Sequence, residues 1–224
     1  MANLKEIRTR LISVKSTRQI TNAMKMVSAA KLRKAQDNIM QIRPYTNKLN
    51  DILRDLDTSQ ISFKENIFFK ERKPERILLV VVTSNRGLCG TFNSNVIKKT
   101  IQIADEKYRI QIKNGNLDIF AIGKKGKDLL KSKKYNVVDS NIEIFDMLHY
   151  GNVLPVAKKI IEDFVNNKYS VVELIYNQFK NAALQILVEE QLLPIVRKER
   201  IMDRFESSTD YILEPGKEYI IDEL

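Results

Sequence analysis

The chain has 224 residues, of which 43% are hydrophobic and 29% are charged, and its formal net charge at pH 7 is +10. This length and composition predict one substantial globular domain with an appendage. No run of eighteen apolar residues occurs, so the sequence predicts no membrane-spanning helix. The single cysteine, Cys89, excludes an internal disulfide and agrees with a reducing compartment.

The N-terminal stretch is predicted to form one long helix. Residues 3–43 contain no glycine or proline and are rich in good helix formers. Near both ends of the stretch, apolar residues recur at steps of three and four, which is the spacing of a coiled-coil seam: Leu4, Ile7, Leu11, Val14, Leu32, Ala35, Ile39 and Ile42. Such a helix is about 60 Å long at 1.5 Å per residue. We therefore expect the seam to need a partner.

The middle of this helix departs from the seam. Arg18, Thr21, Lys25 and Ser28 occupy the seam positions there. The apolar stripe is displaced by one residue, or about 100° around the helix axis. It consists of Ile20, Ala23, Met24 and Val27. The ends of the helix and its middle are thus expected to face different partners.

The positive charge of the chain is concentrated in the same stretch. Residues 1–43 hold ten Lys or Arg against Glu6 and Asp37, which leaves +8 of the total +10 on the helix. The residues alone leave three interpretations: a solvated face beside an ordinary core stripe, a nucleic-acid-binding helix, or a shaft gripped by a protein sleeve. Two observations weaken the nucleic-acid interpretation. No aromatic residue precedes Tyr45, and neither a leucine zipper nor the spacing of zinc ligands accompanies the basic residues.

Beyond the seam, Pro44 should end or kink the helix by removing the hydrogen bond to Met40. Apolar residues continue to Leu56, so the helix is predicted to resume and to end near residue 57. We expect a long helical segment at residues 1–57 and a polar linker at residues 58–75.

The remaining sequence predicts a Rossmann-like α/β domain at residues 76–216. Residues 77–82 are an unbroken aliphatic run, typical of a strand buried on both faces of a parallel sheet. Strands and helices then alternate, which indicates a parallel sheet with helices on its faces. Further strands are predicted at 117–122, 136–139 and 171–176, helices at 93–107, 125–131 and 153–166, and edge strands at 184–191 and 211–213.

The sequence offers no convincing catalytic or ligand-binding motif. The segment Ser84–Asn93 lies where nucleotide-binding folds place a phosphate loop, but it has neither the G-x-G-x-x-G spacing nor the Lys-Ser/Thr of a Walker loop. Gly123–Gly126 is interpreted as a helix-start turn, Cys89 as a buried small residue and His149 as a polar loop residue. We predict no catalytic residue, no cofactor and no metal.

Several segments, in the right order, resemble the ATP synthase gamma subunit family. Residues 20–36 (ITNAMKMVSAAKLRKAQ) resemble its N-terminal signature, and residues 84–90 (SNRGLCG) resemble its most recognisable loop, with Asn85 where an aspartate is usual. The resemblance runs from residue 3 to the end of the chain. Shorter matches lie at residues 4–8, 12–15, 122–126, 176–182, 190–194 and 211–215.

The resemblance also implies a second long helix, which pairs with the first as an antiparallel coiled coil. Residues 217–224 would be its start, and the sequence given stops there. We therefore expect a chain that lacks the seam's partner, either as a truncated sequence or as a natural fragment. The basic N-terminus suits a mitochondrial transit peptide superficially, but the resemblance begins at residue 3 and leaves no room for a leader.

The function implied by the resemblance is that of the non-catalytic central-stalk rotor of a bacterial, proton-translocating ATP synthase. Its implied partners are the alpha and beta subunits of the catalytic ring, the epsilon subunit and the membrane rotor ring of c subunits. The expected location is peripheral, on the cytoplasmic side of the inner membrane, without membrane insertion or nucleic acid. The residues expected to contact the ring are Ile20, Met24, Lys25, Val27, Arg33 and Lys34.

Overall fold

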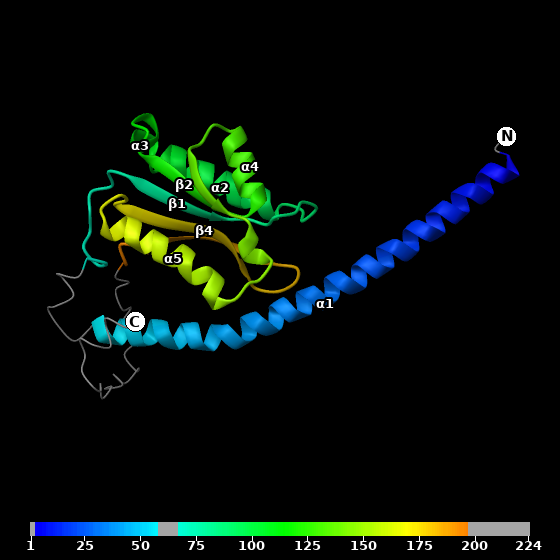
Figure 1. Ribbon diagram of the computed structural model, residues 1–224, viewed down its shortest axis with the longest axis horizontal. Coiled ribbons are helices and arrows are strands. Elements are labelled where there is room, and N and C mark those ends of the chain that lie inside the picture. Colours follow the sequence, from blue (N-terminus) through cyan, green and yellow to red (C-terminus); the bar gives the residue numbers. More distant parts are fainter. Residues whose placement is uncertain (1–2, 58–66, 197–224) are drawn as a thin grey trace. The chain divides into compact units, whose positions relative to one another are not determined.

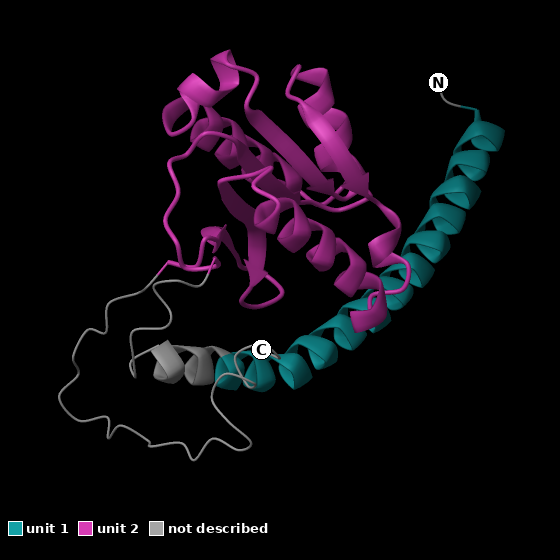
Figure 2. Cartoon of the chain, turned by 60° about the vertical axis from the view of Figure 1, so that its left-hand side comes forward, with its two compact units in different colours: residues 1–60, 205–224 teal, residues 61–204 magenta. Residues whose placement is uncertain are grey.

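The computed structural model describes residues 3–57 and 67–196 (Figure 1). The chain divides into two compact units, residues 1–60 with 205–224 and residues 61–204 (Figure 2). The described part of the first unit is the helix α1, and the described part of the second is an α/β domain. The strand predicted at 211–213 and the helix start predicted at 217–224 lie outside the described residues. No helix in the described part of the chain is long and apolar enough to cross a membrane.

Helix α1 spans Leu4–Asp57 without interruption and includes Pro44. It ends at the residue that the sequence predicts, and the prediction that the helix continues beyond Pro44 is confirmed. The ribbon is a single, gently curved rod, as long helices commonly are (Figure 1). Just after the proline, the Thr46 hydroxyl donates a hydrogen bond of 2.8 Å to the carbonyl of Ile42.

The α/β domain is built on five strands in the order β3-β2-β1-β4-β5. The strands are β1 (Ile77–Val82), β2 (Leu117–Ile122), β3 (Val137–Asn141), β4 (Val171–Phe179) and β5 (Gln185–Leu193). The first four are parallel, as predicted, and β5 runs antiparallel to β4 along its whole length. Residues 77–81 of β1 are each no more than 2% exposed, which confirms a central strand buried on both faces.

Helices cover both faces of this sheet, and each face has its own core. On one face, α2 (Phe92–Glu106) and α4 (Lys124–Ser132) pack over Ile77, Leu79 and Val81. On the other, α5 (Tyr150–Val165) packs over Leu78 and Val80. The largest differences from the predicted bounds are at α5, which begins at residue 150 rather than 153, and at β4, which ends at residue 179 rather than 176. Two short helices, α3 (Arg109–Lys113) and the 3₁₀ helix η2 (Glu143–Phe145), were not predicted.

One buried carboxylate holds the amino ends of the four parallel strands together. Asp118 in β2 is fully buried, and its oxygens accept hydrogen bonds from Arg76 (2.8 and 3.1 Å), Asn136 (2.6 Å) and Tyr169 (3.0 Å). Arg76 and Asn136 directly precede β1 and β3, and Tyr169 lies two residues before the start of β4. The Asp118 carboxylate raises the pKa of the Arg76 guanidinium, and burial together with that carboxylate raises the pKa of the Tyr169 phenol.

A second buried carboxylate, Glu173 in β4, holds the end of α2. Its Oε1 atom accepts a hydrogen bond of 2.6 Å from the Tyr108 hydroxyl and pairs with the ammonium group of Lys107. Burial, followed by this hydrogen bond, raises the pKa of the Tyr108 phenol. Both contacts join residues that lie far apart in the sequence, so the sheet and its helix are fixed by tertiary rather than local interactions.

Replacing the first carboxylate by an amide is expected to destabilise the α/β domain strongly. In Asp118→Asn, a single carbonyl oxygen faces three donors and the new NH₂ group has no acceptor. The free energy of unfolding should fall by about 3 kcal/mol, as for other broken buried ion pairs. Urea denaturation followed by near-UV circular dichroism measures this loss.

The matched control is Asp139→Asn. Its carboxylate pairs with Lys159 at the surface, where 40% of the Asp139 side chain is exposed. Exposed ion pairs contribute little, so the loss should stay below about 1 kcal/mol. Equal losses in the two variants would contradict the special role of the buried carboxylate.

Candidate partner-binding surface

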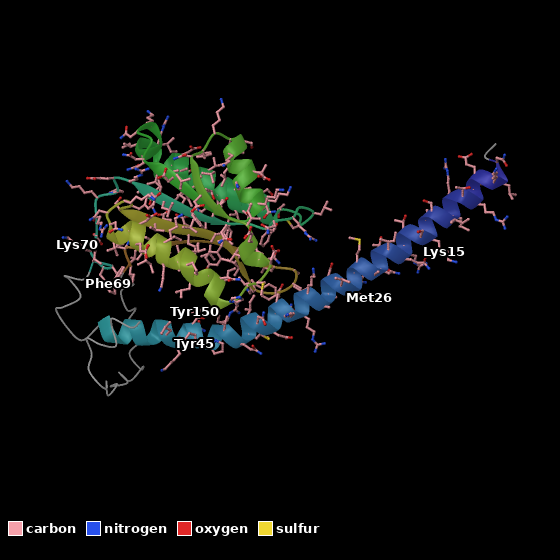
Figure 3. All side chains as sticks on the ribbon, viewed as in Figure 1. Lys15, Met26, Tyr45, Phe69, Lys70 and Tyr150 are labelled. Atoms are coloured by element: carbon pink, nitrogen blue, oxygen red, sulfur yellow. The ribbon has the colours of Figure 1, made fainter. Side chains whose placement is uncertain are left out.

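The six residues predicted to contact a partner all lie on α1 and are exposed. The apolar members, Ile20, Met24 and Val27, are 59%, 65% and 57% exposed. The cations Lys25, Arg33 and Lys34 are also exposed, and no ion pair to them occurs within residues 3–57 and 67–196. Side chains along the helix extend outward, as Figure 3 shows for Lys15 and Met26. The structure thus leaves apolar and positive groups available on one helix.

The coiled-coil seam is a second exposed apolar surface on α1. Leu4, Leu11, Val14 and Ile42 are 81%, 68%, 68% and 61% exposed, whereas Ile39 is half-buried. Helix geometry separates the seam from the displaced stripe by about 100°. The two surfaces can therefore be covered by different partners at the same time.

Helix α1 carries side-chain charges of only one sign over a long segment. Residues 7–36 contain eight Lys or Arg and no Asp or Glu. At its start, Arg10 pairs with Glu6 at 2.9 Å, one helical turn away. The segment consequently attracts acidic partners and repels a second copy of itself.

Threonine hydroxyls along α1 form hydrogen bonds that the sequence analysis missed. The hydroxyls of Thr9, Thr17 and Thr21 donate to the carbonyls of Lys5, Ser13 and Thr17, at 2.9, 2.9 and 2.8 Å. Such bonds to the preceding turn satisfy the hydroxyl donors inside the helix. Thr21, which interrupts the seam in the sequence, is therefore less polar toward a partner than its residue type suggests.

The loop between β1 and α2 corrects one prediction. Cys89 is exposed, so its interpretation as a buried residue is wrong. Asn93, which is 7% exposed, lies beneath the loop instead and donates hydrogen bonds to the Ser84 hydroxyl (2.8 Å) and the Cys89 sulfur (3.3 Å). Leu88 and Gly90 in this loop have φ values of 61° and 60°, in the left-handed region.

The other loop predictions agree with the structure. Gly123 directly precedes α4 with φ 106°, and a Cβ atom there would lie 2.1 Å from the carbonyl oxygen of Thr83. Only glycine fits this helix-start turn. His149 is exposed and directly precedes α5.

Within the described residues, no group of three His, Cys, Asp or Glu side chains could hold a metal ion.

Comparison with known proteins identifies the family. The family model for ATP synthase matches residues 3–224. The chain is 49% identical over 221 residues to the ATP synthase gamma chain of Flavobacterium psychrophilum, which covers 99% of this chain and 74% of that relative. The chain belongs to the ATP synthase gamma-chain family. The gamma chain of Christiangramia forsetii is 45% identical over 224 residues, which cover 100% of this chain and 76% of that one.

Solved structures share the fold of this gamma-family chain. The central stalk with c-ring of the Tetrahymena thermophila mitochondrial ATP synthase aligns with a TM-score of 0.62 and 23% identity, over 91% of this chain and 84% of that one. The rotor of the Euglena gracilis enzyme aligns with a TM-score of 0.58 and 24% identity, over 83% and 61%. The Rossmann-like fold with a long helix is therefore confirmed, and the nucleic-acid interpretation receives no support.

The exposure of the seam predicts how α1 behaves in the chain as given. Seven large aliphatic seam residues could each contribute about 1.5–3 kcal/mol on burial, or on the order of 10 kcal/mol together. That sum is comparable to the stability of a whole domain, about 5–15 kcal/mol. In a monomeric sample, amide hydrogen exchange should be slow in β1 and fast across residues 4–42. Appending an antiparallel partner helix after Leu224 should slow exchange across the seam.

Strong protection of residues 4–42 in a demonstrably monomeric sample of the unextended chain would show that the seam needs no partner.

Proposed function

We propose that this chain is the central-stalk rotor subunit of a proton-translocating ATP synthase, and that α1 turns inside a ring of alpha and beta subunits. The observation that carries the proposal is the exposed apolar surface of Ile20, Met24 and Val27 on α1. Three exposed cations of the same helix, Lys25, Arg33 and Lys34, form no ion pair within the described residues. Relatives named ATP synthase gamma chain, and fold neighbours described as a central stalk and a rotor, support the same assignment.

The role of this chain is mechanical, and the chemistry of ATP synthesis takes place on its partners. A shaft changes a partner's conformation only if it contacts the alternative states of that partner differently. The asymmetric surface of α1 meets this requirement. Its apolar stripe covers one side of the helix in the middle segment, and the seam covers another side at the ends.

The six residues of α1 expected to contact the ring, called the gripping residues below, form the gripping surface. They are proposed to make two kinds of contact. Contacts of Ile20, Met24 and Val27 are non-directional, so they tolerate sliding against an apolar sleeve. Lys25, Arg33 and Lys34 act over longer distances and favour orientations in which they face carboxylates of the ring. The gripping residues therefore combine easy movement with preferred angular positions.

The α/β domain is proposed to lie outside the ring, near the epsilon subunit and the membrane rotor ring of c subunits. The complex would couple proton flow through the membrane sector to ATP synthesis. Its location would be peripheral, on the cytoplasmic side of a bacterial inner membrane. Bacterial relatives named ATP synthase gamma chain, whose matches cover this chain almost completely, support the assignment to a bacterial enzyme.

Charge reversal on the gripping surface tests the proposal. The chain, extended by an antiparallel partner helix after Leu224, is co-expressed with alpha and beta subunits. In Arg33→Glu/Lys34→Glu, repulsion from acidic ring loops should lower the yield of assembled complex or its rate of ATP hydrolysis roughly tenfold, the equivalent of about 1.4 kcal/mol.

The control variant is Lys131→Glu/Lys133→Glu, which reverses two exposed charges at the end of α4. It should retain wild-type assembly and activity. If both double variants lose assembly or ATP hydrolysis to the same extent, the assignment of the ring contacts to α1 is wrong.

The isolated chain is expected neither to bind ATP tightly nor to hydrolyse it. The loop after β1 lacks the phosphate-loop residues, and its polar groups bond to one another: the Ser84 backbone N–H donates to Asn93 Oδ1 at 2.9 Å, and the Ser84 hydroxyl donates to the Arg86 carbonyl at 2.6 Å. Isothermal titration calorimetry measures the binding. Micromolar affinity that disappears on mutation of this loop would contradict the prediction.

A further inference from the structure

The pair Asn114–Gly115 is the one place in the sequence where glycine follows asparagine. It directly follows α3, the short helix labelled in Figure 1, and both residues are exposed. Glycine has no Cβ atom, so its backbone nitrogen can approach the preceding side chain without steric hindrance. A Cβ atom on Gly115 would meet no atom within 4 Å apart from its chain neighbours. The pair thus has the residue types and the access that asparagine deamidation requires.

Deamidation at such a pair is an internal acyl substitution that needs only water and hydroxide. The Gly115 backbone nitrogen loses its proton to hydroxide and forms a bond to the side-chain carbonyl carbon, Cγ, of Asn114. The bond from Cγ to the amide nitrogen breaks, and this nitrogen takes a proton from water and leaves as ammonia, which restores the hydroxide. Water then opens the resulting succinimide ring at either carbonyl, which leaves aspartate or isoaspartate at position 114.

The folded backbone opposes this ring closure. Asn114 has ψ −1°, which eclipses the Gly115 nitrogen with the Asn114 nitrogen and turns it away from the Asn114 side chain. The Gly115 N–H also donates to the Ile112 carbonyl at 3.1 Å, and the Asn116 N–H donates to the Gln111 carbonyl at 2.7 Å. Ring closure therefore requires that the carboxyl end of α3 opens first.

Helix α3 is held by few contacts, so it can open without unfolding of the domain. It has five residues, none of which is buried, and helices this short are marginal without tertiary packing. It is tethered by Ile112, which packs against the core, and by Gln111, whose Nε2 atom donates to the Pro74 carbonyl at 2.6 Å. Segments with so few buried contacts belong to the least stable parts of a protein and open locally.

A second asparagine that precedes a small residue provides an internal comparison. Asn93 precedes Ser94, but it is only 7% exposed and lies in the longer helix α2. Its amide donates to the Ser84 hydroxyl at 2.8 Å and accepts the Ser84 backbone N–H at 2.9 Å. The folded structure therefore protects Asn93 far more strongly than Asn114.

We propose that Asn114 is a site of spontaneous deamidation in the folded chain, at a rate set by the opening of α3. The site lies beside a structural joint, because the Asn116 carbonyl accepts the N–H of Ile77, the first residue of β1, at 2.9 Å. Isoaspartate adds a methylene group to the main chain just before this joint. Both products also place a carboxylate at the carboxyl end of a helix, where the helix dipole disfavours it. Modification therefore weakens the joint between β1 and β2, whatever the partners of the chain.

Incubation of the whole chain in mildly alkaline buffer, followed by peptide mapping with mass spectrometry and isoaspartate-specific methylation, tests the site. Isoaspartate should accumulate at position 114 and not at position 93. The folded chain should convert about ten- to a hundredfold more slowly than the urea-unfolded chain, because opening breaks the backbone hydrogen bonds of Gly115 and Asn116. Asn114→Gln, whose longer side chain closes a ring far less readily, should abolish the isoaspartate.

Two alanine variants of α3 test whether its opening sets the rate. Gln111→Ala removes the tether to Pro74 and should raise the rate in the folded chain about three- to tenfold, the effect of one lost hydrogen bond. The matched control is Ile110→Ala, at a position of the same helix that is 69% exposed. Its rate should stay within about twofold of the wild-type rate. The purified isoaspartate form should melt about 2–4 °C below the unmodified chain.

Isoaspartate at position 114 of the folded chain, formed faster in Gln111→Ala than in Ile110→Ala, supports the proposal. A folded chain that stays intact at position 114 while the unfolded chain converts overturns it, and so does equal conversion at positions 93 and 114. Equal rates in the two alanine variants show that the opening of α3 does not set the rate. An unchanged melting temperature of the isoaspartate form contradicts the weakened joint.

Discussion

The α/β domain depends on the buried carboxylate of Asp118. A fully buried charge is costly unless donors surround it, and here the donors are Arg76, Asn136 and Tyr169. Because these residues precede β1, β3 and β4, and the acceptor lies in β2, one carboxylate aligns the starts of four strands that are far apart in the sequence. The four strands run in the same direction from this cluster, so their carboxyl ends lie together at the opposite edge.

At that opposite edge, the loops that follow the strands are joined by hydrogen bonds to a neutral amide. The Asn85 side chain donates to the Ile142 carbonyl at 2.7 Å and accepts from the Lys124 N–H at 2.9 Å, which joins the loops that follow β1, β2 and β3. An ionised aspartate at this position could accept but not donate. The two edges thus differ in role: the buried carboxylate stabilises one, and the other carries braced, exposed loops, as open α/β sheets commonly do.

Much of this organisation is predictable from local sequence patterns, and the rest depends on long-range contacts. The aliphatic run at 77–82 predicted β1 correctly, and helix periodicity predicted α1, α2 and α4 closely. The antiparallel direction of β5, the Asp118 cluster and the exposure of Cys89 were not predictable, because each depends on residues brought together only by folding. On α1, spacing and charge indicated the six gripping residues, whose role stays a prediction. The hydrogen bonds of the threonine hydroxyls on α1 depend on side-chain rotamers, which the sequence pattern does not reveal.

The surface chemistry of α1 suits a turning shaft for a physical reason. Hydrogen bonds are directional, so free donors on a rotating surface would favour particular positions and resist movement away from them. The hydroxyls of Thr9, Thr17 and Thr21 already donate to backbone carbonyls, so these side chains offer no free donor to a neighbour. Non-directional apolar contact is then expected along the displaced stripe, and preferred angles are expected to come mainly from the cations.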